Sequence, residues 1–246
     1  KVSQPEIAMI GQYAENVYFG KPCGLMDQMA CSIGSLAYID FRNPENPYVE
    51  KVDFDLEKYG YSLCITDTKG SHADLTDEYA AVPEEMKRVA NYFCKEVLAD
   101  ITLDDLLNNV AELRKVLSDR CILRAVHFLT ENKRVEEEVN TLKNGNIELF
   151  LQCIKASGNS SYKFLQNVYS VKNVYQQNVS LALAISETLL AENGACRVHG
   201  GGFAGTIQAF VKNEDVKEYQ KSMNQIFGYG SCSVLKIRKY GGIQVV

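Results

Sequence analysis

Two short strings in the sequence carry residues whose types and spacing could do chemistry. The first is His199-Gly200-Gly201-Gly202-Phe203-Ala204-Gly205, in which three glycines follow one another. Consecutive glycines let the backbone adopt positive φ and let another group approach closely, so their N–H groups can surround an anion. This interpretation predicts a ligand-binding loop at Gly200, Gly201 and Gly202. The alternative is a glycine-lined hairpin that packing alone requires.

Two familiar functions of such a glycine string are disfavoured by the surrounding sequence. A dinucleotide-binding G-x-G-x-x-G requires its third glycine to open a helix, whereas Gly205 leads into T-I-Q-A-F-V, which predicts a strand. The H-G-G-G oxyanion string of lipases requires a G-x-S-x-G pentapeptide, and the chain has none. Arg197 is the nearby candidate for a phosphate contact, and a solvated or ion-paired side chain is its alternative role.

The second string is Cys23-Gly24-Leu25-Met26-Asp27-Gln28, which opens a helical pattern of apolar residues. Asp27 falls in the first turn of this predicted helix. A carboxylate there interacts favourably with the helix dipole, a structural role worth about 0.3–1 kcal/mol. The alternative is a general base, because a carboxylate near a reacting hydroxyl can accept its proton.

The elements that would position these strings are mostly helical. Apolar spacing predicts helices over residues 7–17, 25–33, 82–97, 120–142, 147–168, 174–190 and 216–227. Alternation and β-branched residues predict strands over 36–41, 61–66, 195–199, 206–211 and 232–237. This succession predicts an α+β fold in which helices cover a mostly antiparallel sheet. The Pro-rich turn over 43–47 indicates that a subdomain ends nearby.

Other polar residues are interpreted as structural. His127 lies in an apolar helical run, which predicts a hydrogen-bonded core histidine. His72 is expected in a loop, and neither histidine is assigned to acid–base chemistry. The run Glu136-Glu137-Glu138 predicts a solvated helix face rather than a metal site. Asp67, at a strand end, is more plausible than this run as a second carboxylate that binds a ligand directly. Its alternative role is to accept hydrogen bonds from the backbone of its own turn.

The strings C-G-L-M-D-Q and G-G-G-F-A-G together resemble the galactokinases of the GHMP small-molecule kinase family. The segments that carry the resemblance follow the family's order from about Gln12 to Val211, which is most of the chain. Besides the two strings they are Gly11-Gln12-Tyr13-Ala14-Glu15-Asn16, Asp67-Thr68, Ser71-His72, Glu78-Tyr79, Arg124-Ala125-Val126-His127, Glu131-Asn132, Arg134-Val135 and Ser157-Gly158.

The resemblance implies a domain organisation. Residues 59–246 would form the GHMP-kinase C-terminal domain, with a mostly antiparallel, four-stranded, ferredoxin-like sheet covered by helices. Residues 1–58 would be the remnant of an N-terminal domain of the ribosomal-S5-like type. The family's N-terminal sugar signature and its Gly/Ser phosphate loop do not occur in the chain. We therefore expect a C-terminal portion that does not turn over ATP by itself.

The resemblance also implies an activity, the ATP-dependent phosphorylation of galactose at its anomeric hydroxyl to galactose 1-phosphate, with Mg²⁺ across the phosphates. Asp27 matches the catalytic carboxylate, which accepts or orients the proton of the sugar hydroxyl. Gly24 and Tyr79 match positions that bind the sugar. Gly200–Gly202 match the third family motif, beside the nucleotide, and no metal ligand is expected within this chain.

Two alternatives stay open. Related GHMP kinases act on other sugars, such as galacturonate or N-acetylgalactosamine, and the residues that would decide are mostly upstream. Galactokinase-like folds can also serve as non-catalytic galactose sensors that bind a partner protein. An intact upstream phosphate loop would favour the kinase, and its deletion would favour the sensor.

Composition narrows the remaining classes of protein. The chain has 246 residues, of which 46% are hydrophobic and 23% charged, as in ordinary packed proteins. A net charge of −5 without a basic block argues against nucleic-acid binding. The apolar runs fall short of the roughly 20 residues that span a bilayer. Eight scattered cysteines without a C-x-x-C pair predict reduced thiols and a cytoplasmic protein.

Overall fold

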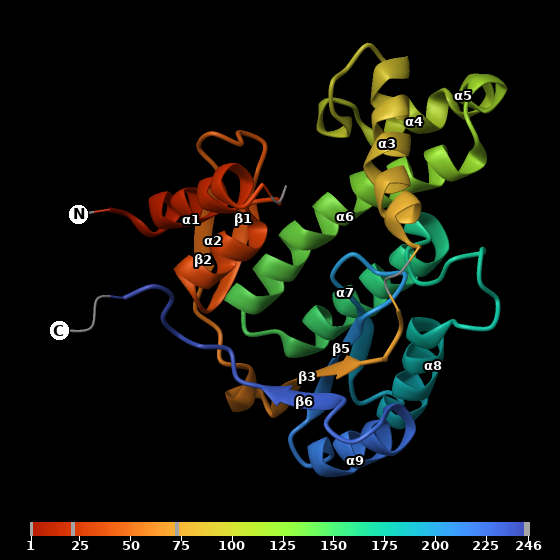
Figure 1. The fold of residues 1–246 in the computed structure, drawn as a ribbon. Helices are drawn as coiled ribbons and strands as arrows, with labels where there is room; N and C mark the ends of the chain where they lie inside the picture. The colour runs from red at the N-terminus through yellow and green to blue at the C-terminus, as the bar shows by residue number, and fades with distance from the viewer. Residues whose placement is uncertain (1, 21–22, 72–73, 244–246) are drawn as a thin grey trace. The chain divides into compact units, whose positions relative to one another are not determined.

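The computed structural model of the chain describes residues 2–20, 23–71 and 74–243 (Figure 1). The chain divides into two compact units. The smaller unit comprises Lys1–Asp55, Leu142–Gly145 and Lys236–Val246, and the larger comprises Leu56–Thr141 and Asn146–Leu235. The predicted boundary between residues 58 and 59 stays a prediction about domains, and both units are discontinuous in sequence. No helix in the described ranges is long and apolar enough to cross a membrane.

The smaller unit contains two helices and a hairpin. Helix α1 (Gln4–Tyr13) begins at a capping box formed by Ser3 and Glu6, and it continues as the π-helical turn η1 (Ala14–Tyr18). Helix α2 (Met26–Ile33) is followed by the antiparallel strands β1 (Leu36–Asp40) and β2 (Tyr48–Val52). The core of the unit is made by four buried side chains, Ala8, Leu25, Met29 and Ile33.

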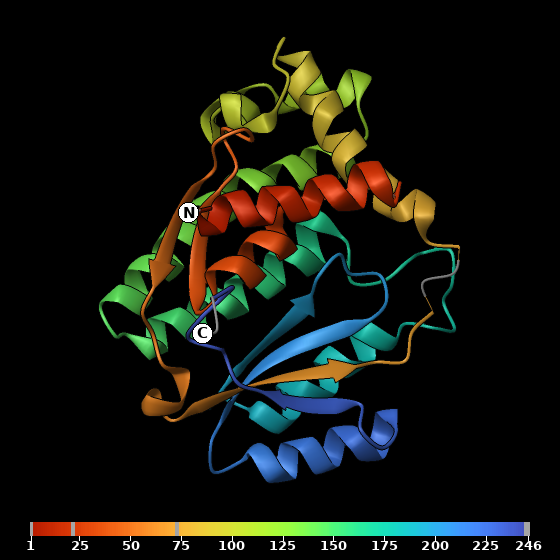
Figure 2. The same cartoon turned by 60° about the vertical axis from the view of Figure 1, so that its left-hand side comes forward.

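The larger unit is built on a four-stranded antiparallel sheet. Its strands are β3 (Tyr61–Asp67), β4 (Ala195–His199), β5 (Thr206–Lys212) and β6 (Cys232–Leu235), in the order β4-β5-β3-β6 (Figure 2). All neighbours are antiparallel. Since the first strand in sequence lies between the third and the fourth, this is a ferredoxin-like arrangement. The α+β fold with a mostly antiparallel four-stranded sheet is thereby confirmed.

Helices cover both faces of this sheet. Helices α8 (Asn178–Leu190) and α9 (Val216–Phe227) pack on one face, where the core includes Ile207, Ala209 and Val211 of β5. Helix α7 (Ile147–Ser160) contacts β4, and its Phe150 meets Phe210 of β5 edge to face, with ring centroids 5.2 Å apart. Because Phe210 alternates with Ala209 along the strand, α7 lies on the opposite face.

A second core of the larger unit is formed mainly by helices. It joins α3 (Thr76–Tyr92), α4 (Leu103–Asn108), α5 (Val110–Val116) and the first part of α6 (Asp119–Lys143). Two short 3₁₀ turns, η2 (Leu56–Tyr59) and η3 (Leu98–Asp100), precede β3 and follow α3. The buried side chains of this core include Val89, Leu106 and Leu113, which are fully excluded from solvent.

Several element boundaries differ from the prediction. Strand β2 was not predicted, because its Glu50-Lys51 pair interrupts the apolar alternation. The helix predicted over 82–97 begins earlier, at Thr76, and continues through Pro83 to Tyr92. The helix predicted over 147–168 ends as the π-helical turn η4 (Ser161–Leu165), after which Gln166 takes a φ of 56°. The helix predicted from residue 174 begins at Asn178.

Candidate functional site

The predicted site residues occur in both units. Gly24 and Asp27 belong to the smaller unit, whereas Tyr79 and the glycine loop, residues 200–205, belong to the larger. His72 and its neighbour Ala73 lie outside the described residues. Each part of the site is built by its own set of elements.

Asp27 is exposed in the first turn of α2 and forms no ion pair or hydrogen bond with the described residues. No side chain caps the start of this helix. A carboxylate in this position has both oxygens available to accept a proton or to bind a cation. Gly24 lies just before the helix, and a Cβ added to it would meet no described residue within 4 Å.

The turn before α2 is held by side chains from α1 and η1. Asn16 accepts the N–H of Cys23 at 2.8 Å, and Gln12 donates to the carbonyl oxygen of Cys23 at 3.2 Å. Gln28 donates to the Cys23 sulfur at 3.3 Å. The structure therefore joins the string containing Gln12 and Asn16 to the string containing Asp27, through Cys23.

The glycine loop connects β4 to β5 and uses the conformations that glycine permits. Gly200, Gly202 and Gly205 have positive φ of 72°, 84° and 86°. Phe203 also has a positive φ, 58°, which is costly for a residue with a side chain. The N–H groups of Gly200 and Gly201 form no hydrogen bond with the described residues. Two adjacent N–H groups of this kind can bind an anion.

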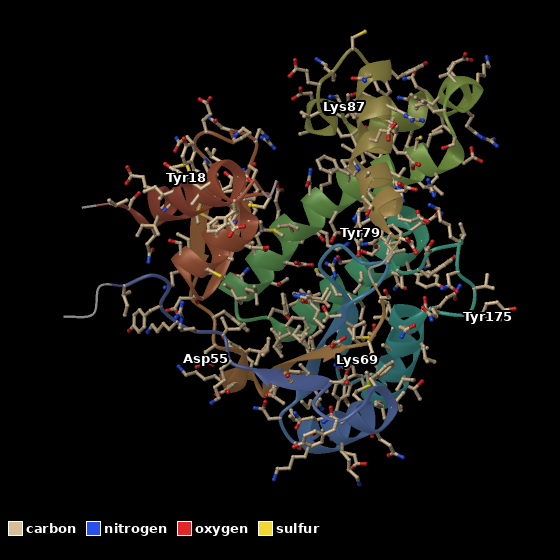
Figure 3. All side chains as sticks on the ribbon, in the orientation of Figure 1. Tyr18, Asp55, Lys69, Tyr79, Lys87 and Tyr175 are labelled. Atoms are coloured by element: carbon tan, nitrogen blue, oxygen red, sulfur yellow. The ribbon has the colours of Figure 1, made fainter. Side chains whose placement is uncertain are left out.

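Tyr79 contacts this loop directly. Its hydroxyl donates to the carbonyl oxygen of Gly202 at 2.8 Å, and its ring meets the Phe203 ring edge to face with centroids 5.4 Å apart. Figure 3 labels this tyrosine near the start of α3. Burial raises the pKa of the Tyr79 hydroxyl, which keeps it a neutral donor. The structure thus brings together two of the predicted site elements of the larger unit.

Asp67 and Arg197 have structural partners. Asp67 accepts both the backbone N–H of Lys69, at 2.9 Å, and the Lys69 ammonium, at 2.7 Å, so its carboxylate binds its own turn. Arg197 donates to the Ser157 hydroxyl at 2.5 Å and pairs with Glu131 at 3.5 Å. Glu131 in turn pairs with Arg134. The ion-paired alternative for Arg197 is therefore the one found.

His127 and Glu138 face the interior of the larger unit. The Nδ1 of His127 lies 2.9 Å from the Ser160 hydroxyl, and burial lowers its pKa to about 4, so the imidazole is neutral. The core interpretation of this histidine is confirmed. For Glu138 the solvated-face prediction is wrong, because its Oε1 is buried without a partner among the described residues. Burial raises the pKa of Glu138 to about 7.

The sequence interpretation missed Asn167, whose backbone and side chain both bind the glycine loop. A helix was predicted through this residue, which would have left its backbone groups in helical hydrogen bonds. The polar pair Gln166-Asn167 after a helical run was the available signal, because asparagine is one of the residues found just after helix ends. In the described part of the chain, no group of three His, Cys, Asp or Glu side chains is arranged to hold a metal ion.

The sequence of the chain was compared with family models and with the sequences of curated proteins. No protein-family model matches the chain. The chain is 29% identical over 223 residues to the galactokinase of Glaesserella parasuis serovar 5, covering 89% of this chain and 54% of that protein. It is 27% identical over 226 residues to the galactokinase of Haemophilus influenzae, with the same coverage of 89% and 54%. The chain therefore spans about half the length of the curated relatives it matches.

Two solved kinase structures share the fold of this chain. The Lactococcus lactis galactokinase complexed with galactose has a TM-score of 0.73 at 23% identity, covering 100% of this chain and 62% of that one. The L. major mevalonate kinase in complex with R-mevalonate has a TM-score of 0.60 at 13% identity, covering 98% of this chain and 60% of that one. The fold is thus that of GHMP-type kinases, and the resemblance to galactokinases predicted from the motifs is confirmed.

Proposed function

We propose that this chain is part of an ATP-dependent kinase that phosphorylates galactose at the anomeric hydroxyl, giving galactose 1-phosphate and ADP. The observation that carries the proposal is the similarity to galactokinases over 89% of the chain. It is supported by the fold shared with a galactokinase that was crystallised with galactose. Both strings that resemble the family present groups suited to this chemistry.

In the proposed reaction, the anomeric oxygen attacks the γ-phosphorus of ATP, an O–P bond forms, and the bond to the β-phosphate oxygen breaks to release ADP. Asp27 accepts or orients the proton of the hydroxyl, a role that suits an exposed carboxylate without an ion pair among the described residues. Gly24 and Tyr79 are proposed to contact the sugar. The lack of described neighbours within 4 Å of a Cβ added to Gly24 suits a close approach to its backbone.

Gly200 and Gly201 are proposed to direct their N–H groups at phosphate oxygens, which suits two adjacent donors without partners among the described residues. Mg²⁺ would neutralise the charge that builds up on the transferred phosphoryl group. This cation usually binds phosphate oxygens with only one or two carboxylates. Asp27, proposed as the proton acceptor, is not assigned to the cation, so Mg²⁺ would be held mainly by phosphate oxygens.

The test is ADP release by the full-length protein that contains this chain, assayed with ATP, Mg²⁺ and a panel of hexoses. Galactose-dependent release is expected, and Asp27→Asn should lower kcat by about 10²–10⁴-fold, the usual contribution of a general base. Since Asp27 is exposed, its substitution should change the free energy of unfolding by no more than about 1 kcal/mol, the contribution of the helix dipole. Asp104→Asn, in the first turn of α4, is the matched control and should leave kcat unchanged.

The panel also separates the alternatives. Turnover only with galacturonate or N-acetylgalactosamine would keep the kinase and change its substrate. Binding of galactose without turnover would favour a sensor and contradict the proposal. A cytoplasmic location is proposed with the kinase, because all eight cysteines are free thiols, as expected in a reducing compartment.

A further inference from the structure

Asn167 binds the glycine loop through both its backbone and its side chain. Its carbonyl oxygen accepts the N–H of Phe203 at 2.5 Å, and its amide nitrogen donates to the carbonyl oxygen of Gly201 at 3.2 Å. A Cβ added to Gly202 would collide with the same Asn167 carbonyl, so the two backbones are in close contact. Asn167 itself is only 5% exposed.

The loop is held by a second residue, Tyr79, whose hydroxyl binds the carbonyl oxygen of Gly202. The peptide between Gly202 and Phe203 therefore has both polar groups bonded, its C=O to Tyr79 and its N–H to Asn167. Successive glycines otherwise lose much conformational freedom on ordering. These bonds fix the loop while the N–H groups of Gly200 and Gly201 remain without a bond to the described residues.

The two segments that hold the loop, residues 165–170 and α3, are themselves joined by buried polar contacts. Arg124, which is fully buried, donates to the carbonyl oxygen of Leu165 at 3.1 Å and pairs with Glu85 of α3 at 2.9 Å. The hydroxyl of Ser170 donates to Glu78, also of α3, at 2.7 Å. Leu165 and Ser170 flank Asn167, and α3 carries Tyr79. The segment 165–170 and α3 are thus joined on both sides of the loop contact.

The amide of Asn167 is not explained by packing stability alone. Its Oδ1 is buried and has no partner among the described residues, which costs free energy that an apolar side chain would avoid. The amide nitrogen, in contrast, donates a hydrogen bond to the glycine loop. The side-chain amide of Asn167 therefore points to a role in setting the loop conformation.

We propose that Asn167 is a positioning residue for phosphoryl transfer, acting through the glycine loop. The inference rests on the proposed kinase function. Asn167 keeps the Gly201–Phe203 backbone in one conformation, so that the preceding N–H groups meet the phosphate without reorganising during the reaction. It acts through Gly201 and Phe203 and does not itself contact the reacting atoms.

The loop contact is tested by amide hydrogen exchange in the full-length protein. Asn167→Ala removes the bond to Gly201, so exchange at Phe203 and Ala204 should become about tenfold faster, while the amides of β5 stay unchanged. Asn159→Ala, on the exposed side of α7, is the matched control and should leave all of these rates unchanged. Unchanged exchange at Phe203 in Asn167→Ala would overturn the proposed contact.

The catalytic part is tested by steady-state kinetics with the same variants, at a temperature where each is fully folded. Loss of one hydrogen bond should lower kcat about tenfold and leave the KM for galactose unchanged. Asn167→Asp, which places a carboxylate against the Gly201 carbonyl, should lower kcat further. A merely structural role would lower the amount of folded enzyme without this split between kcat and KM.

The outcomes separate this inference from the proposed function. An active wild type with normal kcat in Asn167→Ala would overturn the inference and leave the kinase standing. A wild type without sugar-dependent ADP release would overturn the kinase and, with it, the catalytic role of Asn167, whereas hydrogen exchange would still decide whether Asn167 orders the loop.

Discussion

At the scale of single residues, the glycine loop has one position that admits no side chain. Gly202 combines a φ of 84° with close contact to the Asn167 carbonyl, whereas Gly200 has a φ of 72° but open space for a Cβ. Backbone strain applies to both positions, and steric overlap applies only to Gly202. The two glycines therefore differ in what a methyl group would cost.

We predict that Gly202→Ala lowers the free energy of unfolding by about 2–4 kcal/mol, from strain and overpacking together. Gly200→Ala should cost only about 1–2 kcal/mol, because strain alone applies. Urea unfolding of both variants measures the difference. Equal losses of unfolding free energy in the two variants would show that the contact between Gly202 and Asn167 does not restrict the size of the residue at position 202.

Glu138 predicts a pH dependence of stability. Its pKa is raised from 4.5 to about 7, mainly by burial, with the Arg197 and Arg134 charges opposing the shift and Glu131 adding to it. The folded state therefore holds a proton that the unfolded state has lost between pH 4.5 and 7, so Glu138 makes stability fall as pH rises through this window.

We predict that Glu138→Gln removes this loss and stabilises the protein at pH 8 by about 3 kcal/mol relative to wild type, with little difference at pH 4.5. Thermal unfolding of both proteins across this range gives the comparison. Glu136→Gln, on the exposed face of α6, is the matched control and should show no such trend. A constant difference between Glu138→Gln and wild type would contradict a raised pKa.

At the scale of elements, α3 and α6 are joined by a buried ion-pair set. Glu85 of α3 binds Arg124 at 2.9 Å and Arg120 at 2.5 Å, both from α6, and Arg124 is fully excluded from solvent. A buried charge that loses its partner costs far more than an exposed one. The exposed pair of Glu84 and Arg88, on α3, offers a direct comparison.

We predict that Glu85→Leu lowers the free energy of unfolding by about 3–5 kcal/mol, because the Arg124 charge stays buried without its carboxylate. Glu84→Leu should change it by no more than about 1 kcal/mol. Adding Arg124→Met to Glu85→Leu should restore part of the loss, and a double-variant cycle measures this coupling. Additive effects would show that the two side chains do not depend on each other.

At the scale of the whole molecule, the chain spans about half of its curated relatives, 54% of the Glaesserella protein. Asp27 and the glycine loop are the parts of the proposed site that this length supplies. By the family resemblance, the sugar signature and the Gly/Ser phosphate loop are expected in the part of the relatives that this chain does not cover. Phosphoryl transfer depends on positioning all of these groups together.

We predict that the isolated chain releases no ADP above background with galactose, ATP and Mg²⁺, whereas the full-length protein does. The comparison uses equal concentrations in the same coupled assay, with circular dichroism to verify that the isolated chain is folded. Galactose-dependent turnover by the isolated chain would contradict the prediction and would mean that its own residues complete the site.

The sequence by itself determined the family resemblance, the α+β class and most helices and strands, because these depend on local spacing and on short strings of glycine and carboxylate residues. Strand β2, the passage of α3 through Pro83 and the end of the helix before Asn167 were decided by tertiary structure, since packing outweighs local propensity at each. Tertiary structure also decided the surroundings of Glu138 and Asn167. Their surroundings include residues distant in sequence, since the Arg197 charge acts on Glu138 and the Phe203 N–H binds the Asn167 carbonyl oxygen. Neither the pKa of a carboxylate nor the partner of an amide can be read from its neighbours in the chain, because both depend on what folding brings next to them.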